Sequence, residues 1–346
     1  MVEREIMRNK KHIHDVQPAT IDEHFHLLLH CKEEIDPNFT KVTAKDLPEW
    51  YDEDLFKKGQ RFCMDYLLAL IAANLSGLIA ILAVPDILEI LVDSKNNATV
   101  SLSYKRYAQT TLYMYALYKS ELLSSDSLWF KAINVIRWRH ANASKKRIQK
   151  GFNGIYQKDM AITQFGFIGY FFLAPKKLGI ANAEKCMLSF NHFWQVIGYL
   201  LGISDRMNIC RKSVTETRKL CERIQNEIIA KHLNDPVPKF IKYVTNVTEG
   251  MWHIDVSINY DTFMYFTYDL TGIKYKKPLS WYSYLNLKYR QFIFYMYDKP
   301  YIGFVIRMIY NKILILMFWI VENFPILAWI SFGKKKKSLN LYPNLQ

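Results

Sequence analysis

The sequence lacks the short motifs that mark the common nucleotide-dependent and hydrolytic enzymes. It has no Gly-x-Gly-x-x-Gly, no Walker loop, no His-Glu-x-x-His and no Gly-x-Ser-x-Gly. The cysteine-containing haem-thiolate loop of the cytochromes P450 is also absent. These absences exclude the best-known catalytic frameworks and leave few chemistry-bearing residues to consider.

Cysteine is scarce and unpatterned, and the N-terminus lacks the apolar stretch of a signal peptide. The five cysteines are odd in number and contain no Cys-x-x-Cys pair, so neither a disulfide framework nor a structural zinc site is indicated. We expect reduced, mostly buried thiols. The cysteines are Cys31, Cys63, Cys186, Cys210 and Cys221.

Positive charge is abundant but scattered. The net charge is +14, yet basic runs occur only at residues 145–147 and 334–337, and no zinc-finger, RNA-recognition or helix-turn-helix signature accompanies them. We therefore expect no nucleic-acid partner, and an anionic membrane surface explains the charge better. Half of the residues are hydrophobic and 15% are aromatic, enough for a large core and for a pocket that holds a flat macrocycle or a long hydrocarbon.

Apolar residues recur mostly at helical spacing, and strand signals are thin, so the sequence predicts an all-α protein with a single large helical domain. We expect a polar N-terminal extension at 1–46, an oxygenase-like helical domain at 47–240 and an aromatic connecting region at 241–299. An apolar membrane-associated segment at 300–333 and a basic tail at 334–346 complete the chain.

Two apolar stretches are long enough to be candidates for membrane contact. Residues 66–85 carry no charge, and we favour a buried core helix over a membrane span for them. Between Lys312 and Lys334, two apolar halves are separated by Glu322-Asn323 and Pro325. This pattern favours an interfacial or re-entrant hairpin, with a hairpin buried against the main domain as the alternative.

Polar chemistry is concentrated in two short segments, Arg106-Tyr-Ala-Gln-Thr110 and Arg137-Trp-Arg-His140. A spacing of three or four residues places the members of each group on one helix face. A histidine flanked by arginines can ligate a metal or a haem iron while the cations hold acidic groups. The alternative is a basic surface helix that carries one ordinary histidine.

Further motifs occur in order with these two segments. They are Leu47-Pro-Glu-Trp-Tyr51 with Gly59-Gln-Arg61, Asp159-Met-Ala-Ile-Thr163, and the stretch from His192 to Ile203. From Leu47 to about Arg211, the chain resembles the catalytic domain of the rubber oxygenase (latex clearing protein) family and the endoplasmic-reticulum-bound oxygenase of mycophenolic acid biosynthesis. The resemblance implies a globin-like helical core around a haem pocket.

The resemblance also assigns roles to residues. It implies that His140 is the proximal ligand of a b-type haem, with Arg137 and Lys145 as partners of the haem propionates. Arg106 and Thr110 would line the distal side, where a positive charge and a hydroxyl stabilise bound O₂, the co-substrate.

The implied activity is oxidative cleavage of a carbon-carbon double bond in a hydrophobic, isoprenoid or unsaturated chain such as a polyprenyl substrate. Membrane lipid is the expected second partner. We expect the protein at the endoplasmic reticulum membrane, with the catalytic domain facing the cytosol.

Departures from the family pattern keep other interpretations open. Gln109 replaces the lysine that serves as a distal ligand in some rubber oxygenases, and Ser144 replaces an arginine one turn after the proximal histidine. A non-catalytic haem- or lipid-binding protein and a cofactor-free membrane scaffold are therefore the alternatives. His192 is a second candidate ligand, although a satisfied core histidine is favoured, and His26 with His30 fits a solvated amphipathic helix better than a metal site.

Overall fold

The computed structural model describes residues 13–94, 98–122, 124–333 and 339–345. It is all-helical, with 71% of residues in helices and no strand in these ranges, so the predicted all-α class is confirmed. A single isolated bridge pairs Glu34 with Tyr156. The globin-like core and the division into five regions stay predictions.

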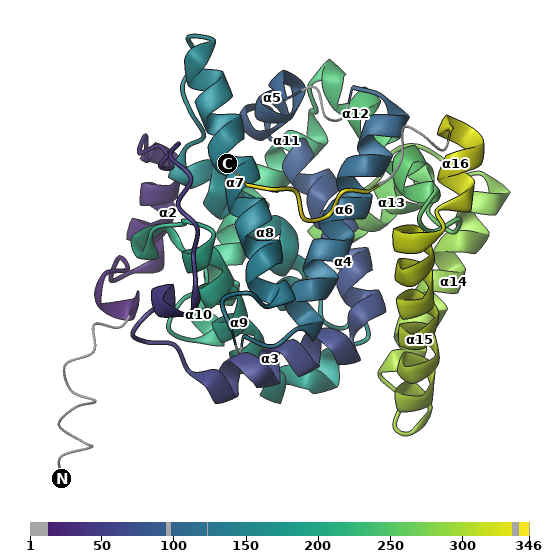
Figure 1. The fold of residues 1–346 in the computed structure, drawn as a ribbon. Coiled ribbons are helices and arrows are strands. Elements are labelled where there is room, and N and C mark those ends of the chain that lie inside the picture. Colours follow the sequence, from purple (N-terminus) through teal and green to yellow (C-terminus); the bar gives the residue numbers. More distant parts are fainter. Residues whose placement is uncertain (1–12, 95–97, 123, 334–338, 346) are drawn as a thin grey trace.

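The helices follow one another with short connections (Figure 1). The first are α2 (Ile21–His30), α3 (Glu53–Asp65), α4 (Leu67–Leu82) and α5 (Pro85–Asp93). The middle of the chain forms α6 (Val100–Lys119), α7 (Leu128–Gln149), α8 (Gln157–Leu173), α9 (Met187–Leu200), α10 (Val214–Arg223) and α11 (Ala230–Asn234). The last are α12 (Pro238–Trp252), α13 (Tyr260–Thr271), α14 (Trp281–Tyr297), α15 (Ile302–Asn323) and α16 (Ile326–Phe332).

Five shorter helical segments complete the part of the fold that the structure describes. Four are 3₁₀ helices, η2 (Ile13–Asp15), η3 (Ala44–Asp46), η4 (Ala181–Cys186) and η5 (Asp205–Met207). The fifth, η6 (Ile224–Ile229), is a π-helical stretch between α10 and α11. The N-terminal α2 packs against α10 and η5.

The uncharged stretch 66–85 forms the core helix α4, as the sequence favoured. Most of its side chains are buried, and it packs against α8, α13 and α15. Small residues permit its closest crossing, because a Cβ on Gly77 would lie 1.8 Å from the carbonyl oxygen of Gly166 on α8. All five cysteines are free thiols, and only Cys186 is exposed.

This crossing makes Gly77 the most size-sensitive position of the core. We expect Gly77→Ala to lower the free energy of unfolding by about 3 kcal/mol, because α4 and α8 must move apart to admit the methyl group. Gly272→Ala is the control, since a Cβ there meets nothing within 4 Å and only its positive φ of 78° is unfavourable. Strain of this kind costs about 1 kcal/mol. Denaturant titration measures both values, and equal losses would contradict the close crossing.

The helices that carry the two polar segments begin at capped N-termini. The Thr99 hydroxyl accepts a hydrogen bond from the Leu102 N–H at the start of α6, and the Ser127 hydroxyl accepts one from the Phe130 N–H at the start of α7. α6 and α7 pack against each other, and α12 and α3 pack on other sides of α6. The caps therefore fix where Arg106 and His140 fall along two neighbouring helices.

Residues 183–203, which are mostly apolar, do not form one continuous helix. The segment begins as the 3₁₀ helix η4, and α9 covers only Met187–Leu200. Gly202 has a φ of +89°, a left-handed conformation that glycine adopts readily and that ends a helix. Gly198 and Gly202 therefore do not share a helix face, and Gly198 faces the side chains of Asn208 and Gln164.

The C-terminal helices lie together along one side of the molecule, where Figure 1 shows α14, α15 and α16. α15 ends at Asn323, and α16 begins at Ile326 after Pro325, so the predicted break in the apolar segment is confirmed. Among the described helices, α15 is long and apolar enough to cross a membrane. The basic run at 334–337 lies outside the described residues.

Candidate functional site

The structure brings the two polar segments together. Arg106 and Thr110 lie on α6 and His140 lies on the adjacent α7. Burial, and then the positive charges of Arg106, Arg137 and Arg139 in that order, together lower the pKa of His140 to about 4. The imidazole is therefore neutral at physiological pH and lies among three guanidinium groups.

His140 has an unsatisfied ring nitrogen. Its side chain is partly exposed, but Nδ1 is buried and has no hydrogen-bond partner within the part of the chain that the structure describes. A buried polar atom without a partner costs about 1–3 kcal/mol. A neutral imidazole with an unsatisfied nitrogen is the form that binds a metal, so this residue fits the role of a haem ligand.

Part of the Arg137 guanidinium forms a structural hydrogen bond. Its Nη1 donates to the Leu200 carbonyl at 2.7 Å, which satisfies the C-terminal end of α9 with a cation. Its Nε is buried without a partner among the described residues, and burial lowers the pKa of its guanidinium. One edge of Arg137 therefore has a structural function, and its Nε is unpaired among the described residues.

The two predicted distal residues lie one helical turn apart on α6 and are both partly exposed. The Thr110 hydroxyl donates to the Arg106 carbonyl at 3.0 Å, so its proton is used within the helix while its oxygen lone pairs stay free to accept. The Arg106 guanidinium lies 5.7 Å from the centroid of the Tyr107 ring.

Lys145 and Ser144 differ in environment. Lys145 is exposed and is not among the cations that lower the pKa of His140. Ser144 is fully buried, and its hydroxyl accepts a hydrogen bond of 3.0 Å from the Ile155 N–H, which helps to fix the turn after α7. At this position the chain therefore has a structural hydroxyl in place of the arginine of the rubber oxygenases.

Sequence reasoning missed a polar cluster formed by Arg139, Gln109 and Tyr113. The Arg139 Nη2 donates to the Gln109 Oε1 at 2.7 Å and to the Tyr113 hydroxyl at 3.3 Å, and its guanidinium lies 5.1 Å from the Tyr113 ring centroid. Gln109 and Arg139 both lie inside the two polar segments. Tyr113 lies one turn beyond Gln109, and this helical spacing was the signal that the sequence offered.

His192 is a satisfied core histidine. Its Nε2 accepts a hydrogen bond of 3.0 Å from the backbone N–H of Asp52, the residue that caps α3. Its ring packs edge-on against Trp50 at 5.9 Å between centroids. This arrangement agrees with the interpretation favoured from the sequence and leaves His140 as the stronger ligand candidate.

Other motif residues have structural functions. Asp159 is buried in the first turn of α8 and accepts from the Tyr156 N–H at 3.2 Å. Burial raises the pKa of this carboxyl to about 6. Thr163 bonds the Asp159 carbonyl within the same helix. These residues hold α8 in place and do not contact the His140 region through any of these bonds.

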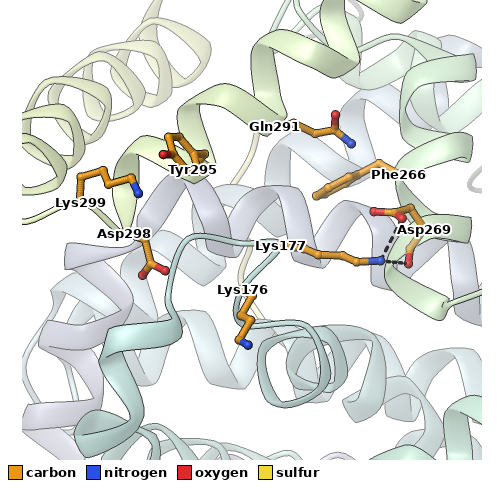
Figure 2. Close-up of a pocket in the computed structure, with 8 residues that line it drawn as sticks. All are labelled: Lys176, Lys177, Phe266, Asp269, Gln291, Tyr295, Asp298 and Lys299. Atoms are coloured by element: carbon orange, nitrogen blue, oxygen red, sulfur yellow. Dashed lines mark hydrogen bonds and ion pairs between the residues drawn. The ribbon is translucent and has the colours of Figure 1, made fainter.

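Two surface pockets lie elsewhere. The first, of about 200 Å³, is shown in Figure 2 and combines lysines and aspartates, with Lys177 paired to Asp269 at 2.9 Å. The second, of about 540 Å³, lies beside the start of α14. None of the predicted site residues lines either pocket. No group of three or more histidine, cysteine or acidic side chains with metal-binding geometry occurs in the described ranges.

Comparison with protein-family models, with curated proteins and with solved structures found no match for this chain.

The closeness of Arg106 and His140 is testable without any cofactor. We expect Arg106→Gln to raise the pKa of His140 toward 6.5, because a positive charge that disfavours the imidazolium is removed. Lys145→Gln is the control and leaves this pKa unchanged. NMR titration of the haem-free protein measures the pKa in both variants.

Because the pKa of His140 in the folded protein lies below its unfolded value, this group makes stability fall as the pH drops from about 6.5 to about 4.

Proposed function

We propose that this protein is a membrane-associated b-type haem oxygenase that cleaves a carbon-carbon double bond in a hydrophobic, isoprenoid or unsaturated chain. The observation that carries the proposal is His140, a neutral imidazole with a buried, unpartnered nitrogen among three arginines. The order of motifs shared with the rubber oxygenases supports the same assignment.

The residues present suit the haem in specific ways. His140 would hold the iron, and the cations nearest to it, Arg106, Arg137 and Arg139, would neutralise the propionates or a developing negative charge. Haem iron would supply the activation of O₂, and the protein supplies binding and polarity. Lys145 is the weakest of the predicted partners, because it is exposed and does not act on His140.

On the substrate side, Arg106 and Thr110 would contribute a fixed positive charge and a hydroxyl oxygen. Preorganised groups of this kind stabilise charge that develops during a reaction, because they need no reorientation. We expect Arg106→Ala to reduce turnover of a polyprenyl substrate at least tenfold with haem content unchanged, since the charge is lost and the ligand is kept. Oxygen uptake and product analysis measure it, and Lys105→Ala, one residue away on α6, is the control.

A non-catalytic haem- or lipid-binding protein is the second candidate, and Gln109 and Ser144 favour it. Gln109 is engaged by Arg139, and Ser144 by the Ile155 N–H, so neither replaces the reactive groups found in the rubber oxygenases. Bound haem without oxygen uptake or cleavage of polyprenyl substrates would identify this second function.

Membrane association is supported by the outward face of α15. The side that faces the protein is also apolar, with Leu314, Phe318 and Val321 buried. It includes the half-buried Arg307 and Asn311, whose side chains donate to the carbonyls of Tyr297 and Met64 at 2.7 Å. The outward stripe of α15 is apolar. The exposed apolar side chains of α15 and α16 include Phe304, Ile309, Ile313, Leu316, Trp319, Ile320 and Ile330.

On α14, too, a cation is buried while aromatic side chains are exposed. Arg290 is buried and donates to the Ser257 carbonyl at 2.7 Å, whereas Trp281 is 77% exposed. Monomeric soluble proteins rarely expose continuous apolar surfaces of this kind, and aromatic residues are typical of a membrane interface. We call the outward faces of α14, α15 and α16 the apolar surface.

The apolar surface supports attachment in the plane of the membrane. α15 packs along α3, α4 and α6, so its buried stripe is held by the domain while the outward stripe is left for lipid. We propose that the protein lies on the endoplasmic reticulum membrane with the catalytic domain and both termini in the cytosol. A glycosylation acceptor appended after Gln346 should stay unmodified, and its modification would contradict this topology.

A further inference from the structure

The end of the chain folds back over the helices that carry the candidate site. Residues 339–345, which we call the tail, have no helical or strand structure and cross α6 toward α7 (Figure 1). Leu341 is only 8% exposed, and Leu339, Tyr342 and Leu345 pack partly buried against the core. An extended segment of apolar side chains is therefore seated on the body of the protein.

Two side chains of α6 recognise the backbone of the tail. The Gln109 Nε2 donates to the Asn340 carbonyl at 2.9 Å, and the Tyr113 hydroxyl donates to the Leu341 carbonyl at 2.5 Å. The rings of Tyr113 and Tyr342 lie 6.1 Å apart between centroids. Consecutive carbonyls are thus bound by residues one helical turn apart, which fixes the register of the tail on α6.

The two α6 side chains that bind the tail belong to the candidate site. Gln109 precedes Thr110, and both Gln109 and Tyr113 are held by Arg139, which precedes His140 and contributes to its electrostatic environment. The tail therefore lies on α6 beside residues that belong to the candidate site.

α15 and α16 contact the same helix as the tail. Phe318 of α15 packs on Tyr115 at 5.2 Å, and Phe332 of α16 packs on Tyr104 at 6.0 Å, so the two contacts lie on α6 before and after Gln109 and Tyr113. α6 therefore contacts both the helices that carry the apolar surface and the tail.

We propose that the tail is a latch that closes the α6–α7 face in the absence of lipid and is released when the apolar surface binds a membrane. Closure of the latch does not depend on the proposed membrane association, because it is a contact within the chain. The identification of lipid as the agent that releases the latch does rest on that proposal. Release would open the site where a hydrophobic substrate leaves the bilayer.

The test measures access to His140 in the full-length, haem-free protein. Diethyl pyrocarbonate modifies neutral imidazoles, and peptide mass spectrometry gives the rate at His140. We expect Leu341→Asp to raise this rate several-fold, because a charge cannot stay in the buried position of Leu341. Asn344→Asp places the same charge at an exposed tail position and should leave the rate unchanged. A chain that ends at Ser338 removes the whole latch and should match Leu341→Asp.

Vesicles that contain anionic lipid should raise the rate for the wild-type chain and add nothing to the truncated one. An unchanged rate in both Leu341→Asp and the truncated chain would overturn the latch. Failure of the wild-type chain to float with vesicles would instead refute the membrane association. Flotation without any change at His140 would refute the coupling between them.

Discussion

The His140→Ala variant is expected to lose stoichiometric haem binding, with the Soret band reduced to the background of non-specific association. The reason is that His140 provides the unsatisfied, neutral imidazole nitrogen of the candidate site. Without this imidazole, the iron of the proposed haem would have no protein nitrogen to bind, and the three nearby arginines could not replace it. Absorbance spectra and pyridine haemochrome assays of the purified variants measure the effect.

His192→Ala is the matched control for this experiment. Its Nε2 accepts from the Asp52 N–H, so its loss removes a structural hydrogen bond and leaves a buried donor unpaired. We expect a loss of about 2 kcal/mol in stability, with haem binding kept. Loss of haem from His192→Ala alone would reverse the assignment of the ligand.

The second large effect concerns the apolar surface. A variant with Ile313→Asp, Leu316→Asp and Ile320→Asp is expected to lose vesicle binding while it keeps its fold, because all three side chains point away from the protein. Each apolar side chain buried in lipid contributes about 1.5 kcal/mol. Together they should lower the partition coefficient by more than about 100-fold.

Leu128→Asp and Phe152→Asp provide the control, because they place charge on exposed apolar residues outside α14, α15 and α16. Flotation of both proteins with vesicles of anionic and neutral lipid gives the comparison. Binding of the triple variant at the wild-type level would show that the apolar surface is not the attachment site. Equal loss in the control would show that the effect of added charge is non-specific.

Helical periodicity predicted the fold class well because it depends on local spacing. The boundaries of α6, α7 and α8 follow from capping residues and from glycines such as Gly151, whose φ of +81° lies in the left-handed region after α7. The end of α9 was harder to predict, because a glycine at position 202 is equally compatible with close packing of two helices and with a turn that ends a helix. The hydrogen bond from Arg137 to the Leu200 carbonyl satisfies this helix end, and it joins residues far apart in the sequence.

The candidate site was only partly visible in the sequence. The pairing of Arg106 with His140 was expected from two motifs, and their electrostatic coupling is consistent with it. The contribution of Arg139 and the seating of Leu341 over Tyr113 were not expected, because they join residues separated by as many as 228 positions. Local spacing contains no information about such contacts.

The orientation of α15 was likewise not predictable from the sequence. The sequence marks residues 313–332 as apolar, but hydropathy does not reveal which side faces the protein. Arg307 and Asn311 bind backbone carbonyls of the domain, and this contact orients the apolar side chains outward. The orientation turns a general expectation of membrane association into a surface with named residues.

The haem content of the wild-type chain tests the central claim most directly. The full-length protein, produced with ample haem and purified, should carry about one b-type haem per chain, with a Soret band that shifts on reduction. A purified, folded protein that shows no Soret band and does not bind added haem in a stoichiometric titration would contradict the account.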